Sequence, residues 1–147
     1  MKKKIYLAGA MGCYTDCPQK ATQWREDVSK IIWERGCENK WSIFDPTKHY
    51  NYWNPSHITE KEIMRYEFNV LSRCDCVLVD LKNLEKSIGT SDEILLSYLR
   101  GIPVIGFYEG VDNIDSIHPW KVEQIDRIET GKDALQNAID YILNYYS

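Results

Sequence analysis

The sequence of 147 residues lacks any apolar stretch long enough to cross a bilayer, and it also lacks a secretion signal. The apolar run at residues 5–11 is short, and it leads into polar sequence without a small-residue cleavage pattern. These two absences exclude a membrane-spanning or exported protein. We therefore expect a cytoplasmic protein that makes no contact with a membrane.

Concentrated positive charge is also missing. The formal net charge is -4, and the basic residues are scattered apart from Lys2, Lys3 and Lys4, which precede the first apolar run. Proteins that bind duplexes carry a clustered basic surface that neutralises phosphates. Polymeric nucleic acid is therefore excluded as the expected partner.

The cysteines fit neither a disulfide framework nor a zinc site. Their number is odd, five, and the expected compartment is reducing, which favours free thiols. The spacings within the set match no standard zinc-ligand pattern. We expect neither a bound metal nor a cofactor. The five residues are Cys13, Cys17, Cys37, Cys74 and Cys76.

The residues that are present describe one globular domain spanning residues 1–147, without a linker or an internal repeat. Apolar residues make up 44% of the chain and charged residues 27%. Strands are expected at residues 3–8, 41–44, 76–81 and 103–107, with a short fifth strand within residues 122–128. Amphipathic helices are expected at residues 19–35, 59–73, 89–101 and 132–145.

This alternation of strands and helices predicts an α/β fold. The strands at 76–81 and 103–107 are continuously apolar, as expected for a parallel sheet covered on both faces. We expect a three-layer, doubly wound sandwich of the Rossmann or flavodoxin-like type, with roughly five parallel strands. Ligands of such folds bind beyond the carboxyl ends of the strands, where strand order reverses.

Several side chains are assigned to packing or capping. Thr59 and Glu62 have the spacing of a capping box, and Asp75 is expected to cap or end the same helix. Gly36 is placed as a helix stop. The predicted core includes the stripe Ile94, Leu95, Tyr98 and Leu99, together with Trp24, Trp33 and Trp41.

The strongest local signal is the segment SIGTSDE at residues 87–93. A glycine turn after a strand places Asp92 and Glu93 in the first turn of a helix. Two interpretations of these carboxylates are open: they complement the helix dipole, or they perform chemistry.

At this point the chain resembles the nucleoside 2-deoxyribosyltransferase-like family, which includes deoxyribosyltransferases and nucleoside 5'-monophosphate N-glycosidases. The resemblance covers most of the chain. It is carried by KIYLAGAM ending at Met11, WR at 24–25, YEFN at 66–69, CDCVLVDL ending at Leu81, and SIGTSDE followed by GIPVIGF.

The resemblance implies a retaining mechanism. The family nucleophile matches Glu93, whose carboxylate would attack the anomeric carbon and form a covalent glycosyl-enzyme. The family's second acidic residue lies 26 positions earlier, at Glu67, where aspartate is more usual; it would protonate the departing base or orient the nucleophile. Tyr6 matches a tyrosine that hydrogen-bonds the catalytic carboxylate, or it is simply a packed aromatic.

The same resemblance implies the substrate contacts. Ser87 matches the position at which monophosphate hydrolases carry serine and nucleoside transferases carry aspartate, and it favours a nucleotide. Ala10 replaces a phosphate-contacting serine, so Arg25 is a compensating anion ligand or a surface charge. The loops that approach the sugar and the base contribute Gly9, Gly12, Asp45, His49, Tyr52, Trp53, Asp80 and Gly89.

Relatives often complete each site with a residue from a neighbouring subunit. Ser116 or His118 would be its counterpart here, in a homodimer or a larger homo-oligomer. The small-molecule partner is a nucleoside or nucleotide, and the glycosyl acceptor is either a second base or water. Two alternatives stay open: a noncatalytic nucleotide-binding or sensing module, and an NAD-cleaving glycohydrolase, although the chain lacks the Gly-x-Gly-x-x-Gly pattern of dinucleotide binders.

Overall fold

Five parallel strands form one sheet in the order β2-β1-β3-β4-β5. The computed structural model describes residues 1–11, 19–49 and 59–147. The strands are β1 (Lys3–Ala8), β2 (Trp41–Phe44), β3 (Cys76–Asp80), β4 (Val104–Glu109) and β5 (Arg127–Gly131). This order confirms the predicted doubly wound fold, and it places the reversal of strand order between β1 and β3.

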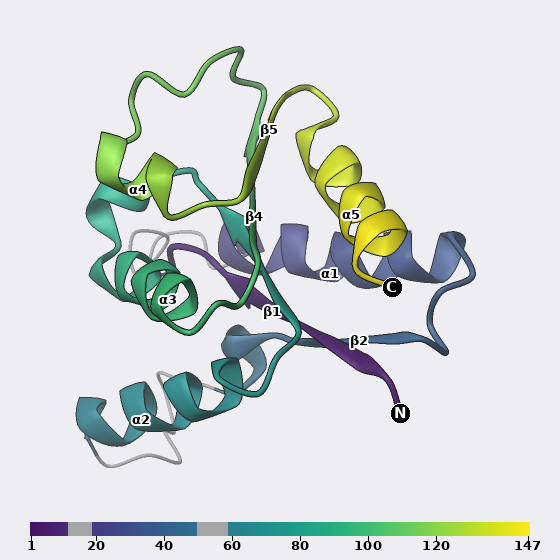
Figure 1. Ribbon diagram of the computed structural model, residues 1–147, viewed down its shortest axis with the longest axis horizontal. Coiled ribbons are helices and arrows are strands. Elements are labelled where there is room, and N and C mark those ends of the chain that lie inside the picture. Colours follow the sequence, from purple (N-terminus) through teal and green to yellow (C-terminus); the bar gives the residue numbers. More distant parts are fainter. Residues whose placement is uncertain (12–18, 50–58) are drawn as a thin grey trace.

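Helices cover both faces of the sheet and make three layers (Figure 1). One face carries α1 (Gln19–Glu34) and α5 (Ala134–Tyr145), and the other carries α2 (Glu60–Leu71), α3 (Ile88–Leu99) and the short α4 (Pro119–Glu123). Two short 3-10 helices, η2 (Pro46–Lys48) and η3 (Leu84–Lys86), follow β2 and β3.

The apolar residues of β1 alternate between two cores because successive strand side chains point to opposite faces. Ile5 and Leu7 pack in the core beneath α1 and α5. Tyr6 and Ala8 pack in the second core, beneath α2 and α3. The tyrosine of β1 therefore points toward the helix that carries Glu93.

The predicted helix signals are confirmed in α1 and α2. The Thr59 side chain accepts from the Glu62 backbone N–H at 3.3 Å, and the Glu62 carboxylate accepts from the Thr59 N–H at 3.3 Å, which completes the capping box. Gly36 follows α1 with a φ of +68°, a left-handed conformation that glycine adopts without a steric penalty.

The predicted core stripe of α3 is wrong in three of its four members. Ile94 is fully buried, whereas Leu95, Tyr98 and Leu99 are 38%, 56% and 71% exposed. The face of α3 that packs inward instead presents Thr90, Glu93 and Ser97 beside Ile94. Hydrophobic periodicity misplaced the face because polar side chains occupy the inward positions.

Three smaller assignments are also corrected. Trp33 is 68% exposed because its neighbour Ile32 occupies the core face of α1. Asp75 does not cap α2; its Oδ2 accepts from the Lys4 backbone N–H at 2.7 Å and joins the starts of β1 and β3. Within residues 122–128 the strand begins only at Arg127, because α4, which His118 caps and Pro119 opens, extends to Glu123.

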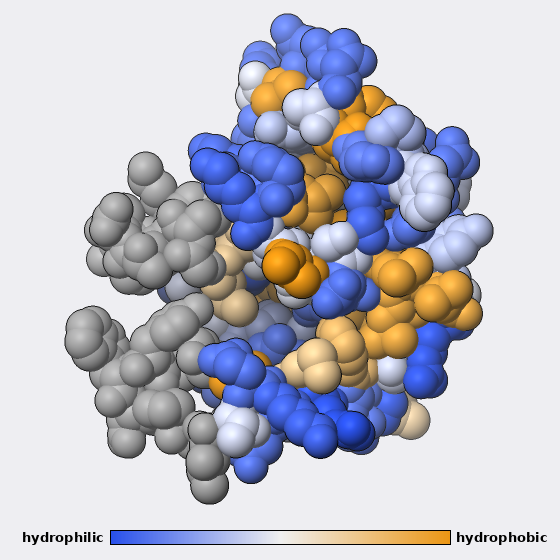
Figure 2. All heavy atoms as spheres, turned by 90° about the vertical axis from the view of Figure 1, so that its left-hand side faces the viewer, coloured by the Kyte–Doolittle hydropathy of each residue, from blue (hydrophilic) through white to orange (hydrophobic). Residues whose placement is uncertain are grey.

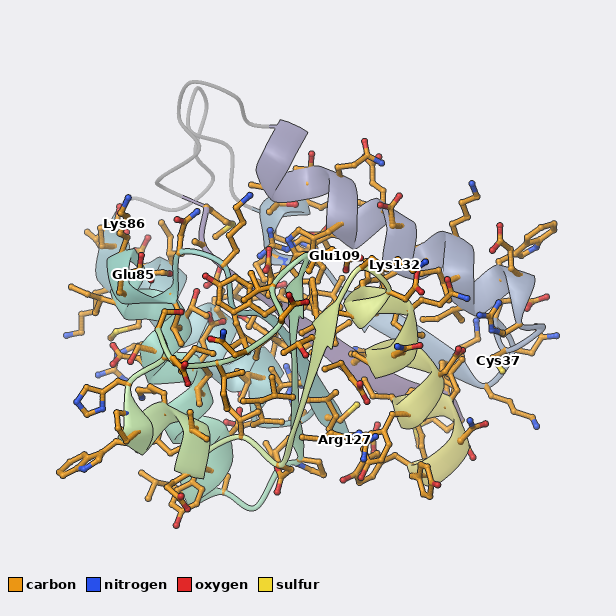
Figure 3. The ribbon with its side chains drawn as sticks, turned by 90° about the horizontal axis from the view of Figure 1, so that it is seen from above. Cys37, Glu85, Lys86, Glu109, Arg127 and Lys132 are labelled. Atoms are coloured by element: carbon orange, nitrogen blue, oxygen red, sulfur yellow. The ribbon has the colours of Figure 1, made fainter. Side chains whose placement is uncertain are left out.

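The two ends of the sheet carry different segments. Seen from above, Glu109 and Lys132, which lie at the carboxyl ends of β4 and β5, are close together, while Arg127 lies at the opposite end of β5 (Figure 3).

None of the helices in the described part of the chain has the length and apolar character to cross a membrane.

Candidate active site

The carboxyl ends of β1, β2 and β3 and the facing helices α2 and α3 bring together the residues expected to perform chemistry. Glu93 lies in the second turn of α3, whose N-terminus is capped by the Ser87 hydroxyl accepting from the Thr90 N–H at 3.3 Å. This cap fixes the helix start and therefore the direction in which Glu93 points, toward β1 and α2.

Glu93 is almost completely buried, with 7% of its surface exposed. Its Oε2 has no hydrogen-bond partner within the described residues. Burial raises the pKa of Glu93 to about 8; the Tyr6 hydroxyl opposes this rise, and the charge of Glu67 adds to it. A buried carboxyl with an unused oxygen is costly for folding, so its position indicates a role outside stability.

Tyr6 lies beside Glu93 at the bottom of the site. Its ring stacks on Phe44 with centroids 5.3 Å apart, and its buried Oη has no partner of normal hydrogen-bond geometry among the described residues. Burial and the charges of Glu93 and Glu67 raise the pKa of Tyr6 far above its usual range. The phenol therefore keeps its proton and is available as a donor to the Glu93 carboxylate.

Glu67 lies on α2, on the opposite wall from Glu93, and is half-buried. Burial raises the pKa of Glu67 to about 7, although the Arg25 charge opposes this rise. A carboxyl with such a pKa holds a proton near neutral pH and can release it to a substrate atom. The structure therefore pairs two carboxyls of raised proton affinity in one cleft.

A cavity of about 420 Å³ opens between α2 and α3. Figure 2 faces this side of the molecule, where apolar surface interrupts the polar side chains of the helices. The volume suits a ligand the size of a nucleoside or nucleotide. The cavity is lined by Met11, Glu60, Lys61, Ile63, Met64, Glu67, Phe68, Ile88, Gly89, Asp92 and Glu93.

Arg25 is not a surface charge, because only 1% of its surface is exposed. Its guanidinium donates to the carbonyl oxygen of Gly9 at 3.2 Å and to that of Ala21, and its Nε lies 3.6 Å from Asp45 Oδ1. The side chain also stacks on the Trp24 ring, with its guanidinium carbon 4.6 Å from the centroid. Arg25 is thus held by α1 and by the ends of β1 and β2, and it is absent from the lining of the cavity.

Asp45 and Asp80, predicted to contact the base or the sugar, each accept a hydrogen bond from a backbone N–H two residues later in the chain. Asp45 is buried, and its Oδ1 accepts from the Thr47 N–H at 2.9 Å. Asp80 Oδ1 accepts from the Lys82 N–H at 3.0 Å, and burial raises the pKa of Asp80 to about 6. Both carboxyls lie at strand ends, where the fold predicts a ligand.

His49 is exposed and lies flat on Phe44, with ring centroids 4.8 Å apart and planes 7° apart. Phe44 thus stacks on both Tyr6 and His49, which extends an aromatic column outward from the site. Gly12, Tyr52 and Trp53, predicted to approach the sugar or the base, lie outside the described residues.

Gly9 follows β1 at a point where a side chain would crowd its neighbours. A Cβ there would lie 3.1 Å from the Trp24 ring, 3.3 Å from Asp80 Cβ and 3.4 Å from Arg25 Nη2. Gly89, in contrast, has open space around its Cα, as a Cβ there would meet nothing within 4 Å. Ala10, next to Gly9, is buried.

This difference predicts opposite outcomes for two glycine substitutions. Gly9→Ala is expected to lower the free energy of unfolding by about 1–3 kcal/mol, because Trp24 and Arg25 must move. Gly89→Ala is expected to leave it unchanged or raise it by up to about 1 kcal/mol, since alanine is the better helix former. Urea unfolding measures both, and equal destabilisation by the two variants would contradict the expectation.

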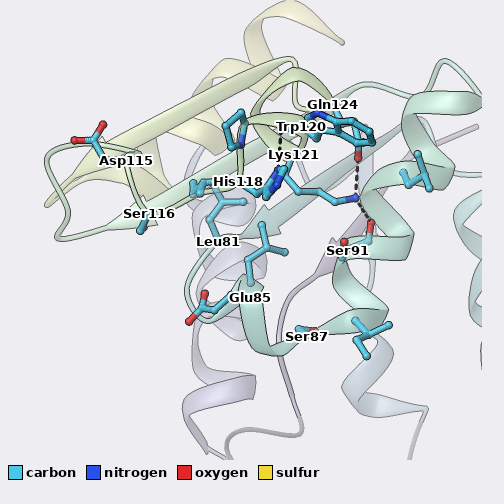
Figure 4. Close-up of a pocket in the computed structure, with 15 residues that line it drawn as sticks. Leu81, Glu85, Ser87, Ser91, Asp115, Ser116, His118, Trp120, Lys121 and Gln124 are labelled. Carbon is cyan, nitrogen blue, oxygen red and sulfur yellow. Dashed lines mark hydrogen bonds between the residues drawn. The ribbon is translucent and has the colours of Figure 1, made fainter.

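A second and larger pocket, of about 850 Å³, lies between η3, α3 and the segment that leads into α4. It contains Ser87, Ser116 and His118, which project from different segments around one hollow (Figure 4). Lys121 Nζ, on α4, donates to the Ser91 carbonyl oxygen of α3 at 2.9 Å and links the two helices that line this pocket. Ile88 lines both pockets and separates these residues from Glu93.

Several residues of the Glu93 cavity were not predicted from the sequence, among them Ile63, Met64 and Phe68. Helical spacing could have found two of them, because Ile63 and Met64 lie four and three positions before Glu67 on the same helix face. The Arg25–Asp45 pair left no signal in the sequence, since the residues are 20 positions apart and meet only when β1 and β2 align.

Among the residues that the structure describes, no group of three or more His, Cys, Asp and Glu side chains is placed to hold a metal ion. The described cysteines Cys37, Cys74 and Cys76 are free thiols. Burial, the first cause in each case, raises the pKa of Cys74 to about 11 and that of Cys76 further still, so both thiols stay protonated and unreactive at neutral pH.

No family model matches this sequence, and no curated protein is significantly similar to it. Solved structures are nevertheless closely similar in architecture. A conserved protein from Enterococcus faecalis superposes with a TM-score of 0.75 at 16% identity, over 96% of this chain and 99% of the other. The 2-deoxyribosyltransferase from Leishmania mexicana gives a TM-score of 0.67 at 16% identity, over 99% of both chains.

This chain has the fold of a 2-deoxyribosyltransferase. The CMP N-glycosidase of Clostridium botulinum shares it, with a TM-score of 0.60 at 15% identity over 99% of this chain and 100% of the other. The architecture implied by the sequence resemblance is therefore confirmed over essentially the full length. Within the deoxyribosyltransferase fold of this chain, Glu67 and Glu93 face one cavity from α2 and α3.

Proposed function

We propose that this chain is a member of the nucleoside 2-deoxyribosyltransferase-like family and that it breaks the N-glycosidic bond of a nucleoside or a nucleoside 5'-monophosphate. The observation that carries the proposal is the pairing of Glu93 and Glu67 across one cavity, where the buried Glu93 Oε2 has no hydrogen-bond partner among the residues that the structure describes. A stabilising role does not account for such a pair, because burying unpaired carboxyls costs free energy.

In the first step the Glu93 carboxylate attacks the anomeric carbon of the sugar. The bond from that carbon to the base nitrogen breaks, and its electron pair goes to the base, which takes a proton from Glu67. In the proposed mechanism the Tyr6 hydroxyl, which keeps its proton, donates to the Glu93 carboxylate and orients it. The product of this step is a glycosyl ester of Glu93 and a free base.

In the second step an acceptor attacks the same carbon and releases the Glu93 carboxylate. The acceptor gives its proton to Glu67, which restores the acid: with water as acceptor the reaction is hydrolysis, and with the N–H of a second base it is deoxyribosyl transfer. The cavity between α2 and α3 is open at its mouth toward solvent-exposed residues such as Met64 and Ile88.

The proposed substrate class rests on the serine at position 87, which lines the larger pocket and directly precedes Ile88, a residue that lines both pockets. A serine hydroxyl can donate to a phosphate, and an aspartate at that position would repel it. The Clostridium botulinum protein that shares the fold is a CMP N-glycosidase. We therefore favour a nucleoside 5'-monophosphate, and we place the reaction in the cytoplasm.

The direct test incubates the purified protein with a panel of nucleosides, 5'-monophosphates and NAD, with and without a second free base, and separates the products by chromatography. Free base together with a sugar phosphate identifies a nucleotide hydrolase, and a new nucleoside identifies a transferase. Binding without turnover of any substrate would overturn the proposal in favour of a noncatalytic module.

We also propose that the chain works as a homodimer in which each site is completed from the other subunit. Ser116 and His118 line a pocket separate from Glu93, so within one chain they do not reach the proposed nucleophile. The helix α3 between the two pockets and the adjacent α4 expose several large apolar side chains, which a second subunit would cover. This surface consists of Ile88, Leu95, Tyr98 and Leu99 of α3 and Trp120 of α4.

Mixing two inactive variants tests the shared site. Glu93→Ala and His118→Ala homodimers are each expected to be inactive, and exchanging their subunits is expected to restore about a quarter of wild-type activity, because half of the dimers then hold one intact site. Analytical ultracentrifugation gives the oligomeric state of each preparation. A monomer, or a mixture that stays inactive after verified exchange, would contradict the shared site.

A further inference from the structure

Lys61 is the one lysine or arginine that lines the Glu93 cavity among the residues that the structure describes. Its side chain is exposed at the second position of α2. Residues 12–18 and 50–58, which the structure does not describe, contain neither lysine nor arginine. Of the lysines and arginines of one chain, Lys61 is therefore the candidate to meet an anionic group of a ligand held in this cavity.

The cavity places Lys61 at its outer part and the proposed nucleophile at its inner part. Exposure falls from Lys61, which is exposed, through the half-buried Glu67 to Glu93, which is 7% exposed. Lys61 and Glu67 are six residues apart on α2, which corresponds to about 9 Å along a helix axis. A nucleoside 5'-monophosphate has a matching separation, because its phosphate is attached through C5' and lies away from the anomeric carbon.

The remaining charged side chains of the cavity lining are carboxyls. Burial raises the pKa values of Glu67 and Glu93 and so reduces their negative charge near neutral pH. Glu60 and Asp92 are exposed, and exposed carboxylates repel a phosphate. Without Lys61, the lining contributed by the described residues would hold acidic groups and no base, and it would disfavour a phosphorylated ligand.

We propose that Lys61 is the specificity-determining residue for the 5'-phosphate of the substrate: its ammonium group pairs with the phosphate while Glu93 meets the anomeric carbon. This inference rests on the proposed function and deepens it, because it assigns the choice between a nucleoside 5'-monophosphate and a nucleoside to one side chain. The Glu93 Oε2, which has no hydrogen-bond partner among the described residues, lies in the same cavity and indicates that a ligand completes it.

Lys61 takes over the role predicted for Arg25. The anion-ligand role of Arg25 is excluded by its position, because the guanidinium is buried and does not line the cavity. A serine hydroxyl such as that of Ser87 donates a hydrogen bond but supplies no charge, whereas hydrogen bonds between an ammonium group and a phosphate are strengthened by charge.

The test measures kcat/KM for a 5'-monophosphate and for the nucleoside of the same base, and it compares the ratio of the two values between variants. Lys61→Met is expected to lower the ratio of monophosphate to nucleoside by about tenfold to a hundredfold, mainly through KM for the monophosphate. Lys61→Arg retains a cation and is expected to keep most of the ratio. Lys30→Met removes the same charge from an exposed position of α1 and is the matched control, with no change expected.

The acidic residues of the lining give a prediction of opposite sign. Glu60→Gln and Asp92→Asn each remove a charge that repels the phosphate, and each is expected to raise the same ratio. An equal ratio in wild type and Lys61→Met, or an equal fall in Lys30→Met, would overturn the inference. Cleavage of the N-glycosidic bond would continue in that case, and the proposed function would stand.

Calorimetric dissociation constants for the same two ligands report the contact without turnover. A preference for binding the monophosphate that is lost in Lys61→Met, in a protein that cleaves neither ligand, would leave the inference standing and remove the proposed function. A wild-type protein that binds the monophosphate no more tightly than the nucleoside would overturn the inference.

Discussion

A Glu93→Ala variant is expected to lose cleavage of the N-glycosidic bond almost completely, with kcat reduced on the order of a thousandfold or more. The reason is that the alanine cannot form the glycosyl ester, and no carboxylate remains in α3 at the same depth. Among the described residues, its neighbour Asp92 is exposed, whereas Glu93 is 7% exposed. Release of free base measured under substrate saturation checks this expectation.

The isosteric Glu93→Gln variant separates chemistry from folding. It is expected to be as inactive as Glu93→Ala but more stable than wild type by about 1 kcal/mol or more, since it removes a buried ionisable group. Glu26→Gln, at an exposed position of α1, is the matched control and should change neither property. Base release at the wild-type rate by a folded Glu93→Gln enzyme would refute the covalent mechanism.

The folded protein is also expected to be more stable in mildly acidic solution than in mildly alkaline solution. Burial raises the pKa of Glu93 from 4.5 to about 8, that of Glu67 to about 7 and that of Asp80 to about 6. At a pH between the ordinary pKa of a carboxyl and these raised values, the folded chain keeps protons that the unfolded chain has lost. The free energy of unfolding therefore falls as the pH rises through this interval. The contribution is full below about pH 4.5 and is lost by about pH 8.

The expected difference between pH 5.5 and pH 8 is on the order of a few kcal/mol, and most of it belongs to Glu93, the more enclosed group. Urea unfolding of wild type and of Glu93→Gln at both pH values measures it. The dependence should be much weaker in the variant, because glutamine has no proton to lose. A wild-type stability that rises over this interval would contradict the raised proton affinity of the site.

Local sequence signals predicted the scaffold well, because each depends on neighbours along the chain. The apolar runs gave β1 and β2 with their observed bounds, and the Thr59–Glu62 spacing gave the start of α2. These features follow from strand burial and from helix capping, which act over a few residues. The same reasoning failed at Trp33 and in α3, where the buried face depends on what packs against the helix.

The features of the candidate site also fall into those that local sequence predicts and those that only the tertiary structure shows. The sequence by itself determined the α/β order of elements and drew attention to Glu93, although it placed this carboxylate in the first turn after a glycine turn, whereas α3 begins at Ile88, includes Gly89 and carries Glu93 in its second turn. Only the tertiary structure decided that Arg25 is buried against Asp45, that Glu67 faces Glu93, and that Ser116 and His118 belong to a different pocket. Proton affinity and pairing depend on burial and on charges brought close through space, and neither is encoded in the spacing of residues along the chain.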